Sequence, residues 1–485
     1  MSVQLVILQI CFVFFNFICG EEINLYGDAG QAYSVEVCLG HPHQKLKLLV
    51  DTGSTTLAVA SYPRQNSQEY FHSDNSTSIY DIGKKVQAEY SQGTWSGRLV
   101  SDFIQIPSLP SVPELRSDIA LITQSHKFFM NGSGWQGLLG LAYLPVGAWG
   151  DGVVVESWLD SVERKMDKQI SFHLKLCGPL NTTNSTHYGY LNIIDDKIPQ
   201  DRPKIFRTPI LRKRWYEVGV ISIRVVNPML NSSNASEIID DSTIVPDGDM
   251  CLKLNAEKSI VDSGTTNIRL PDDLYRQVVD NLKNIYRNSQ VLILDEFWYQ
   301  GEAACWPEPQ VWTLPWLAID LLSADADNQY FTLEIPPQNY MRVVGVYNSS
   351  DKNGTVSEYC YKLGLEVGGS ETVLGYTAME GLQVIFNRSG GWIGWQTSDC
   401  GAKARISGPY NTSTSLTVTC QLTKPVTQVA ISIRAAQWAL CAISIVAATV
   451  LFYLLAPCVK TFFRRKLPTS QQISLSQAAL VEYES

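Results

Sequence analysis

Short runs of apolar residues dominate the chain between residues 26 and 400. They alternate with polar residues or are rich in β-branched side chains, and turn-forming residues separate them; examples are residues 33–37, 45–50, 215–226 and 383–386. This pattern is typical of strands, so we expect a mainly β protein with few helices. Helical periodicity occurs at residues 154–165 and at residues 272–286, where Pro271 precedes the run and a polar turn follows it.

One segment of the chain occurs twice. Residues 48–56 (LLVDTGSTT) and 259–267 (SIVDSGTTN) both lead from apolar residues into Asp-(Thr/Ser)-Gly-(Ser/Thr)-Thr. Each copy is followed about a hundred residues later by two apolar residues and a glycine, at 138–140 and 373–375. A repeat of this size predicts two related β-rich lobes, which we place at residues 26–205 and 206–400.

Each end of the chain carries a longer apolar segment. Residues 1–20 contain no acidic residue and precede Glu21 and Glu22, which predicts a secretory signal peptide; an uncleaved anchor is the alternative. Residues 435–459 carry no charge and, at about 1.5 Å per residue, exceed the roughly 30 Å of membrane hydrocarbon. Basic residues follow this transmembrane helix, so the positive-inside rule predicts a single-pass type I membrane protein with a cytoplasmic tail at 460–485. The polar, Thr/Ser-rich residues 401–434 are interpreted as a stalk.

The remaining composition agrees with a luminal globular protein. A length of 485 residues fits about two to three domains, and the net charge of -9 argues against a nucleic-acid surface. Ten glycosylation sequons all lie on the predicted luminal side: Asn75, Asn131, Asn181, Asn184, Asn231, Asn234, Asn348, Asn353, Asn387 and Asn411. Seven of the eleven cysteines are luminal, so six can pair in 15 possible ways, and Cys38 is the expected leftover.

The repeated motif is a candidate for acid–base chemistry. Two carboxylates held about 3 Å apart cannot both ionise, so they share a proton and offer an acid and a base together. Such a pair can activate a water against a peptide carbonyl without a metal, cofactor or covalent intermediate. Asp51 and Asp262 are the candidate pair. Around them, glycines permit tight turns and hydroxyls supply donors: Gly53, Ser54, Gly264 and Thr265.

The chain resembles the pepsin-like aspartic proteases (family A1), and within them the membrane-anchored beta-secretase (memapsin) group. The resemblance covers nearly all of residues 26–420. It rests on the stretches VDTGSTTLAVA, YSQGTWSGRL, KFFMNGSGWQGLLGLAY, TPILRKRWYEV, KSIVDSGTTNIRLP and VLGYTAMEGLQVIFNRSGGWIGW. It implies a bilobal pepsin-like fold in which Asp51 and Asp262 form the catalytic dyad.

The resemblance also implies a substrate cleft. The flap tip that closes over substrate would be Tyr90, Ser91, Gln92 and Gly93, with Trp95 as the hydrogen-bond partner of Tyr90; the residues alone predict only an aromatic hairpin turn. Leu49, Phe128, Trp135 and Leu138 match the apolar pocket for the side chain before the cleaved bond. Thr266 and Arg269 match further subsites, Arg269 one for polar or acidic side chains, with a surface salt bridge as its alternative.

Three disulfides are implied by the same likeness: Cys177–Cys400, Cys251–Cys420 and Cys305–Cys360. Cys38 has no counterpart and is expected to be a buried strand thiol. The family usually carries a propeptide, yet only about five residues separate Gly20 from Tyr26. Either compartment pH restrains the enzyme, or an N-terminal segment is missing.

Taken together, these features predict an aspartic endopeptidase, a beta-secretase-like sheddase. We expect it to cleave luminal, extracellular or membrane-tethered proteins in the secretory and endosomal pathway and at the cell surface, as a monomer or weak dimer. The alternative is a catalytically silent binding protein of the same fold, against which both aspartates and both glycines argue. The chain contains neither the His-Glu-x-x-His motif of a zinc hydrolase nor a histidine partner for the nucleophile elbow of a serine hydrolase. If the protein were an adhesive glycoprotein, the duplicated Asp-Gly motif would have no explanation.

Overall fold

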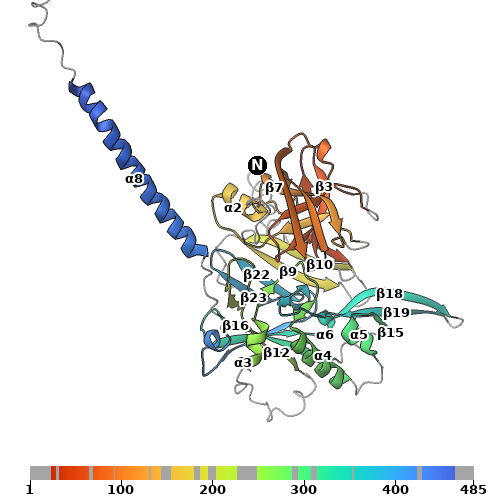
Figure 1. Ribbon diagram of the computed structural model, residues 1–485. Helices are drawn as coiled ribbons and strands as arrows, with labels where there is room; N and C mark the ends of the chain where they lie inside the picture. Colours follow the sequence, from red (N-terminus) through yellow and green to blue (C-terminus); the bar gives the residue numbers. More distant parts are fainter. Residues whose placement is uncertain are drawn as a thin grey trace, which may run out of the picture. The chain divides into compact units, whose positions relative to one another are not determined.

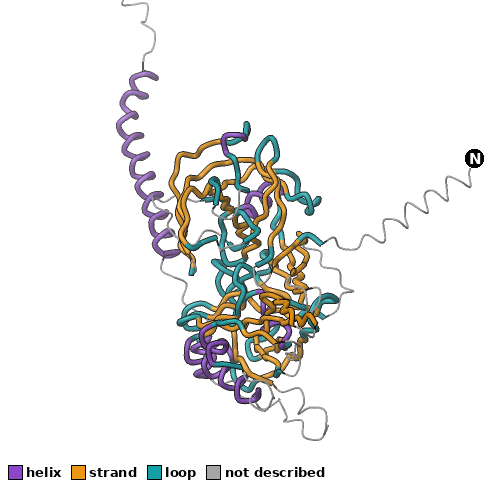
Figure 2. The backbone as a smooth tube through the Cα atoms, turned by 90° about the vertical axis from the view of Figure 1, so that its right-hand side faces the viewer, coloured by secondary structure: helices purple, strands orange, loops and turns teal. Residues whose placement is uncertain are grey.

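A computed structural model describes most of the chain. The described residues are 23–28, 32–64, 69–91, 93–129, 133–143, 155–179, 186–194, 204–226, 248–286, 293–306, 314–351, 354–422 and 429–464. They fall in two compact units, Met1–Thr423 and Lys424–Ser485. Strands and loops make up most of the first unit (Figures 1 and 2), which confirms the mainly β class.

The largest sheet has 13 strands in the order β11-β23-β22-β9-β10-β1-β2-β3-β8-β4-β7-β6-β5. Their bounds are β1 Leu25–Asp28, β2 Ser34–Leu39, β3 Gln44–Asp51, β4 Leu57–Ala60, β5 Tyr80–Tyr90, β6 Gly93–Gln105, β7 Leu115–His126, β8 Gly137–Gly140, β9 Ser171–Pro179, β10 Thr186–Ile194, β11 Phe206–Pro209, β22 Leu382–Asn387 and β23 Trp392–Thr397.

The described part of the C-terminal half contributes three smaller sheets. The first contains β12 Val220–Val226, β16 Trp316–Leu322, β17 Gln329–Ile335 and β24 Arg405–Asn411; the second β13 Ser259–Val261, β21 Thr372–Leu374, β14 Ile268–Leu270 and β20 Leu365–Val367; the third β15 Ala304–Trp306, β19 Gly354–Leu363 and β18 Met341–Asp351. The helices among the described residues of this unit are η1 Ser73–Asn75, α2 Trp158–Met166, α3 Gly248–Leu254, α4 Asp272–Tyr286, α5 Asp295–Gln300, α6 Pro337–Tyr340, η6 Tyr376–Ala378 and α7 Leu416–Thr419.

Both halves build the same arrangement around their copy of the repeat. In the N-terminal half β3 pairs in parallel with β8, which places Asp51 opposite Gly140. In the C-terminal half β13 pairs in parallel with β21. The strand after each aspartate, β4 or β14, runs antiparallel to β8 or β21. The Asp-Gly segment and the apolar-apolar-Gly segment of each copy are therefore neighbours, which confirms two homologous lobes.

The two halves share one sheet and one core. Strand β22 pairs antiparallel with β9 and so joins the C-terminal half to the N-terminal half (Figure 1). Phe386 on β22 stacks on Phe172 of β9, with ring centroids 4.8 Å apart. Buried apolar residues from both halves form one continuous cluster. The described residues of this unit therefore form one compact body, and the lobe boundary near residue 205 stays a prediction.

Helix α4 occupies the range predicted for it, residues 272–286. Its apolar residues recur at intervals of three and four, so one face is buried, including Leu274, Val278 and Leu282. The helix predicted at 154–165 is found later, as α2. Its start is fixed by Ser157, whose hydroxyl caps the helix by accepting a hydrogen bond from the amide of Asp160 at 3.1 Å.

The prediction that a stalk begins at residue 401 is wrong. Strand β24 pairs with β17, so residues 405–411 belong to a sheet of the C-terminal half. Leu416 and Leu422 are buried, and Cys420 forms a disulfide with Cys251. The globular part therefore includes residue 422. The polar composition of β24 misled the prediction because most of its side chains are only partly buried.

The implied disulfides Cys177–Cys400, Cys251–Cys420 and Cys305–Cys360 are all present. Cys38 is a free, buried thiol on β2, as expected. Two of the bonds connect segments more than 160 residues apart, with sequence separations of 223 and 169. They tie the end of the globular chain back onto strand β9, through Cys177, and onto helix α3, through Cys251.

The second unit contains helix α8, Val429–Arg464. Within the described residues it is the one helix long and apolar enough to cross a membrane, through the window Trp438–Leu455. This window lies inside the predicted span 435–459. The predicted signal peptide, residues 1–20, and most of the predicted tail lie outside the described residues.

Candidate active site

Asp51 and Asp262 end equivalent strands and receive equivalent hydrogen bonds. Asp51 is the last residue of β3, and Asp262 directly follows β13. In each turn the glycine amide, Gly53 or Gly264, donates to Oδ1 of its aspartate at 2.8 Å. The hydroxyl of the next residue donates to Oδ2, from Ser54 to Asp51 and, at 2.7 Å, from Thr265 to Asp262. Each carboxylate oxygen thus accepts one hydrogen bond from its own turn.

The two turns interlock through their glycines. A Cβ atom at Gly53 would lie 2.6 Å from the carboxylate carbon of Asp262, and a Cβ atom at Gly264 would overlap Oδ1 of Asp51. Each glycine therefore packs directly against the aspartate of the other half. This close approach is possible only without a side chain, which is the physical reason for glycine at both positions.

Thr52 and Ser263 hold the two turns together. The amide of Thr52 donates to Oγ of Ser263 at 3.1 Å, and the amide of Ser263 donates to Oγ1 of Thr52 at 2.9 Å. Each hydroxyl then donates across the boundary, Thr52 to the carbonyl of Val261 at 3.0 Å and Ser263 to that of Val50 at 2.7 Å. Sequence reasoning missed this role. The available signal was a hydroxyl residue at the same place in both copies.

The environment changes the acidity of Asp51. The residue is 6% exposed. Burial first, and then the neighbouring charge of Asp262, raises the pKa of Asp51 well above its ordinary value, while the hydrogen bonds from Ser54 and Gly53 act in the opposite direction. The pair therefore retains a proton at pH values where an isolated aspartic acid would lose it. Such a pair offers a proton donor beside a proton acceptor.

The β5–β6 hairpin covers this pair. Tyr90 ends β5 and faces Gly93 across the turn. Burial, followed by the charge of Asp51, raises the pKa of the Tyr90 phenol, and hydrogen bonding to Trp95 and Ser54 opposes this shift. Tyr90, Ser91 and Gly93 line the same cleft as the aspartates. Gln92, the remaining predicted flap residue, lies outside the described residues.

All the predicted substrate-binding residues line one cleft with a volume of about 420 Å³: Leu49, Phe128, Trp135, Leu138, Thr266 and Arg269. Phe128 stands between two other rings of the cleft, with centroids 5.5 Å from Tyr90 and 5.7 Å from Trp135. The aromatic and aliphatic side chains of the cleft that come from the N-terminal half form an apolar wall. Such a wall suits an apolar side chain of a bound peptide.

Arg269 was predicted to line a substrate subsite or, alternatively, to form a salt bridge, and features of both are present. It lines the cleft, yet its guanidinium pairs with the carboxylate of Glu366 at 3.3 Å. Its side chain is 12% exposed. The ion pair fixes the guanidinium at the cleft wall, where it can still offer a donor to a ligand because a guanidinium has five N–H groups.

Sequence reasoning also missed a polar group on the cleft wall, formed by Trp215, Lys258 and Glu371. Lys258 forms an ion pair with Glu371 at 2.9 Å, and its ammonium lies 5.1 Å from the centre of the Trp215 ring. Lys258 immediately precedes the second copy of the repeat. Its position one residue before a buried strand was the sequence signal that could have placed Lys258 near the aspartates.

The sequons differ in accessibility. Asn75 and Asn411 are exposed. Asn387 is 7% exposed, and its side-chain oxygen accepts a hydrogen bond from Ser389 at 3.1 Å. Because this side chain is buried, Asn387 is the sequon at which we expect no glycan. The side chain of Asn348 and the sequons at Asn131, Asn181, Asn184, Asn231, Asn234 and Asn353 lie outside the described parts.

Comparison with known proteins gives matches over the same region. The family model of the eukaryotic aspartyl proteases matches residues 32–397. A beta-secretase of Strongylocentrotus purpuratus is 32% identical over 408 residues, which cover 80% of this chain and 70% of the relative. Pregnancy-associated glycoprotein 2 of Sus scrofa is 29% identical over 132 residues, 26% of this chain and 30% of the relative. Its Bos taurus counterpart is 29% identical over 120 residues, 24% and 31% of the two chains.

Proposed function

The chain belongs to the eukaryotic aspartyl proteases and is an aspartic endopeptidase; on this premise we propose that Asp51 and Asp262 are its catalytic dyad. The observation that carries the proposal is the interlock of the two turns. Each carboxylate has the same donors, each touches the glycine of the opposite turn, and the pair is buried. This arrangement suits two carboxyl groups that hold one proton between them.

In the proposed reaction the dyad binds a water molecule. The ionised carboxylate takes a proton from the water as its oxygen attacks the peptide carbonyl carbon, and the protonated carboxyl group donates to the carbonyl oxygen. In the resulting diol, one hydroxyl gives its proton to the carboxylate that is now ionised, and the carboxyl group that took the water proton donates it to the amide nitrogen. The C–N bond then breaks, the two new chain ends leave, and the dyad again holds one proton. Tyr90 and the rest of the β5–β6 hairpin exclude bulk water during these steps.

The proposed substrate is an extended peptide lying across the cleft. An apolar side chain before the cleaved bond would pack against Leu49, Phe128, Trp135 and Leu138. Thr266 and Arg269 would form a neighbouring subsite, in which the guanidinium favours an acceptor-bearing side chain. Glu366 limits this preference because it already neutralises part of the Arg269 charge.

We further propose that the enzyme is a type I membrane protein that acts on luminal or membrane-tethered proteins. Three features support this: the apolar helix α8, the basic residues that follow residue 459, and the similarity to a protein named a beta-secretase. A monomer or weak dimer would suffice, since one chain supplies both aspartates.

The test is cleavage of a peptide library by the full chain in detergent between pH 4 and pH 7. We expect the wild type to cleave, and Asp262→Asn to lose activity while keeping its fold. Asp399→Asn is the matched control, because the Asp399 side chain is 85% exposed. Unchanged cleavage by Asp262→Asn would refute the dyad. A folded wild type that binds peptides but cleaves none would instead favour the silent binding protein.

A further inference from the structure

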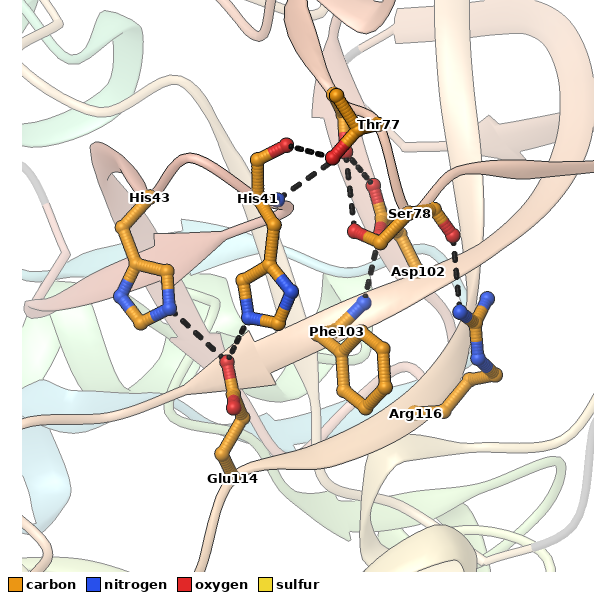
Figure 3. A network of polar contacts seen from close by, with 9 residues as sticks. His41, His43, Thr77, Ser78, Asp102, Phe103, Glu114 and Arg116 are labelled. Atoms are coloured by element: carbon orange, nitrogen blue, oxygen red, sulfur yellow. Dashed lines mark hydrogen bonds and ion pairs between the residues drawn. The ribbon is translucent and has the colours of Figure 1, made fainter.

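A cluster of two histidines and one glutamate lies outside the cleft (Figure 3). His41 and His43 belong to the turn between β2 and β3, and Glu114 directly precedes β7. The Nε2 atoms of the two histidines lie 2.9 and 3.0 Å from the same oxygen of Glu114, Oε1. One ligand atom from each of the three residues lies within 4.8 Å of the others.

The turn that carries the histidines is held in place. The rings of His41 and His43 are stacked, with centroids 5.1 Å apart and planes at 9°, so both direct Nε2 toward Glu114. Phe103 stacks on His41 at 4.9 Å. The amide of His41 donates to the Ser76 hydroxyl at 3.2 Å, and its carbonyl accepts from the Thr77 amide at 2.7 Å. The backbone that carries these ligand atoms is therefore already held in place.

Arg116, two residues after Glu114, is engaged with other partners. The Arg116 guanidinium lies over the Phe103 ring at 4.5 Å. It donates to the carbonyl oxygens of Ser101 at 3.0 Å and Ser78 at 2.9 Å. Among the described residues, the polar contacts of the Glu114 side chain are those with the two imidazoles.

Two imidazoles and one carboxylate are a donor set suited to Zn²⁺. Bonds of about 2.0–2.2 Å place the ligand atoms of a tetrahedral zinc about 3.3–3.5 Å apart. The side chains of His41, His43 and Glu114 are 40%, 39% and 32% exposed. Small rotations of these half-exposed side chains would reach that spacing, and solvent can complete the coordination.

We propose that His41, His43 and Glu114 bind one Zn²⁺ ion. Without metal, each Nε2 donates its proton to the carboxylate. With metal, each Nε2 presents its lone pair to the ion, and each ring carries its proton on Nδ1. The Cys38 thiol is not among the clustered ligand atoms. The site is independent of the dyad and needs no part of the proposed proteolytic function.

The position of the site indicates a structural role. It lies at the start of β3, whereas Asp51 ends the same strand; eight residues at about 3.4 Å each separate the two sites by roughly 25 Å. A bound ion would clip the β2–β3 turn to the segment before β7. We therefore expect zinc to stabilise the N-terminal half and to leave peptide cleavage unchanged.

The test is calorimetric titration of chelator-treated, untagged full chain with Zn²⁺ at pH 7 and pH 5. We expect one equivalent to bind at pH 7, to raise the melting temperature, and to bind more weakly at pH 5 because protons compete for imidazole nitrogen. His43→Gln and Glu114→Gln should each weaken binding by more than about tenfold.

Two further variants serve as controls. His126→Gln makes the same substitution at an exposed histidine outside the cluster and should bind like the wild type. Asp262→Asn should also bind normally, which excludes the aspartate pair as the zinc site. Circular dichroism checks the fold of each variant. The proposal is overturned if zinc does not bind with one-to-one stoichiometry, if His43→Gln and Glu114→Gln bind like His126→Gln, or if Mg²⁺ binds equally well.

Discussion

Gly53 lies against Asp262 across the boundary between the two halves, so close that a Cβ atom on the glycine would be 2.6 Å from the carboxylate carbon. Gly264 and Asp51 repeat the relationship with the halves exchanged. The relative position of the two carboxylates is thus set by contacts that neither half could supply by itself.

Gly264→Ala should therefore abolish most of the activity. The added methyl group would displace the carboxylate of Asp51, and a shift of about 1 Å between reacting groups can cost a hundredfold in rate. Measurement of kcat/KM on a cleaved peptide checks this. Gly345→Ala is the control, because a Cβ atom at Gly345 meets no other atom within 4 Å. Equal rates for the two variants would contradict the interlock.

The raised pKa of Asp51 predicts a pH-dependent stability. Between the ordinary range of an aspartic acid and the raised value, the native state holds more protons than the unfolded state, so stability contributed by protonated Asp51 falls as pH rises. Asp51→Asn removes this dependence. Denaturant unfolding at pH 4.5 and pH 7.5 should show the variant gaining stability relative to the wild type at the higher pH. A constant difference would show that Asp51 titrates alike in both states.

Thr52→Ala and Ser263→Ala should each destabilise the protein by about 1–3 kcal/mol, since each leaves a buried amide of the partner turn without its acceptor. Activity should fall as well, because both turns are released. Urea unfolding of the single and double variants measures their coupling. Thr123→Ala, at an exposed threonine, provides the baseline. Additive effects of the two changes would mean that the residues act separately.

Loss of the Cys251–Cys420 disulfide should lower the free energy of unfolding by about 2–5 kcal/mol. The Cys251→Ser/Cys420→Ser double variant tests this by thermal unfolding. Cys441→Ser, which removes an exposed free thiol, serves as the reference. If residues 401–422 were a stalk, the double variant and Cys441→Ser would have the same melting temperature.

Glycan mapping by mass spectrometry should find Asn75 and Asn411 occupied and Asn387 empty. The first two side chains are exposed, whereas Asn387 is buried and bonded within its own turn. Expression in a secretory host, followed by deglycosylation in heavy-oxygen water, marks each occupied asparagine. Occupied Asn387 would require that turn to open.

The sequence predicts this fold well where a pattern reflects local structure. Helix α4 matches its apolar periodicity over its whole length, and the repeat locates Asp51 and Asp262 because the same turn is built twice. Family resemblance supplied the aromatic wall and the disulfides. The helix α2 prediction started early because an apolar run continues upstream of the Ser157 cap.

What could not be predicted depends on contacts between distant segments. Nothing local shows that β24 pairs with β17, or that Asn387 is covered. Likewise, Trp215, Lys258 and Glu371 are far apart in sequence and meet only at the cleft. In the sequence, the hydroxyl residue after each aspartate is only part of a turn motif. Its role in joining the two turns appears only in the folded structure, where the turns face each other.

The pairing of β22 with β9 has a consequence for synthesis of the protein. A ribosome completes β9 about two hundred residues before β22, so the N-terminal half emerges with an unpaired strand edge and without Asp262. Peptide-cleaving capacity can thus arise only when the chain is nearly finished. If Asp51 and Asp262 form the proposed dyad, a nascent polypeptide that ends before Asp262 carries only one of the two carboxyl groups and cannot cleave peptides.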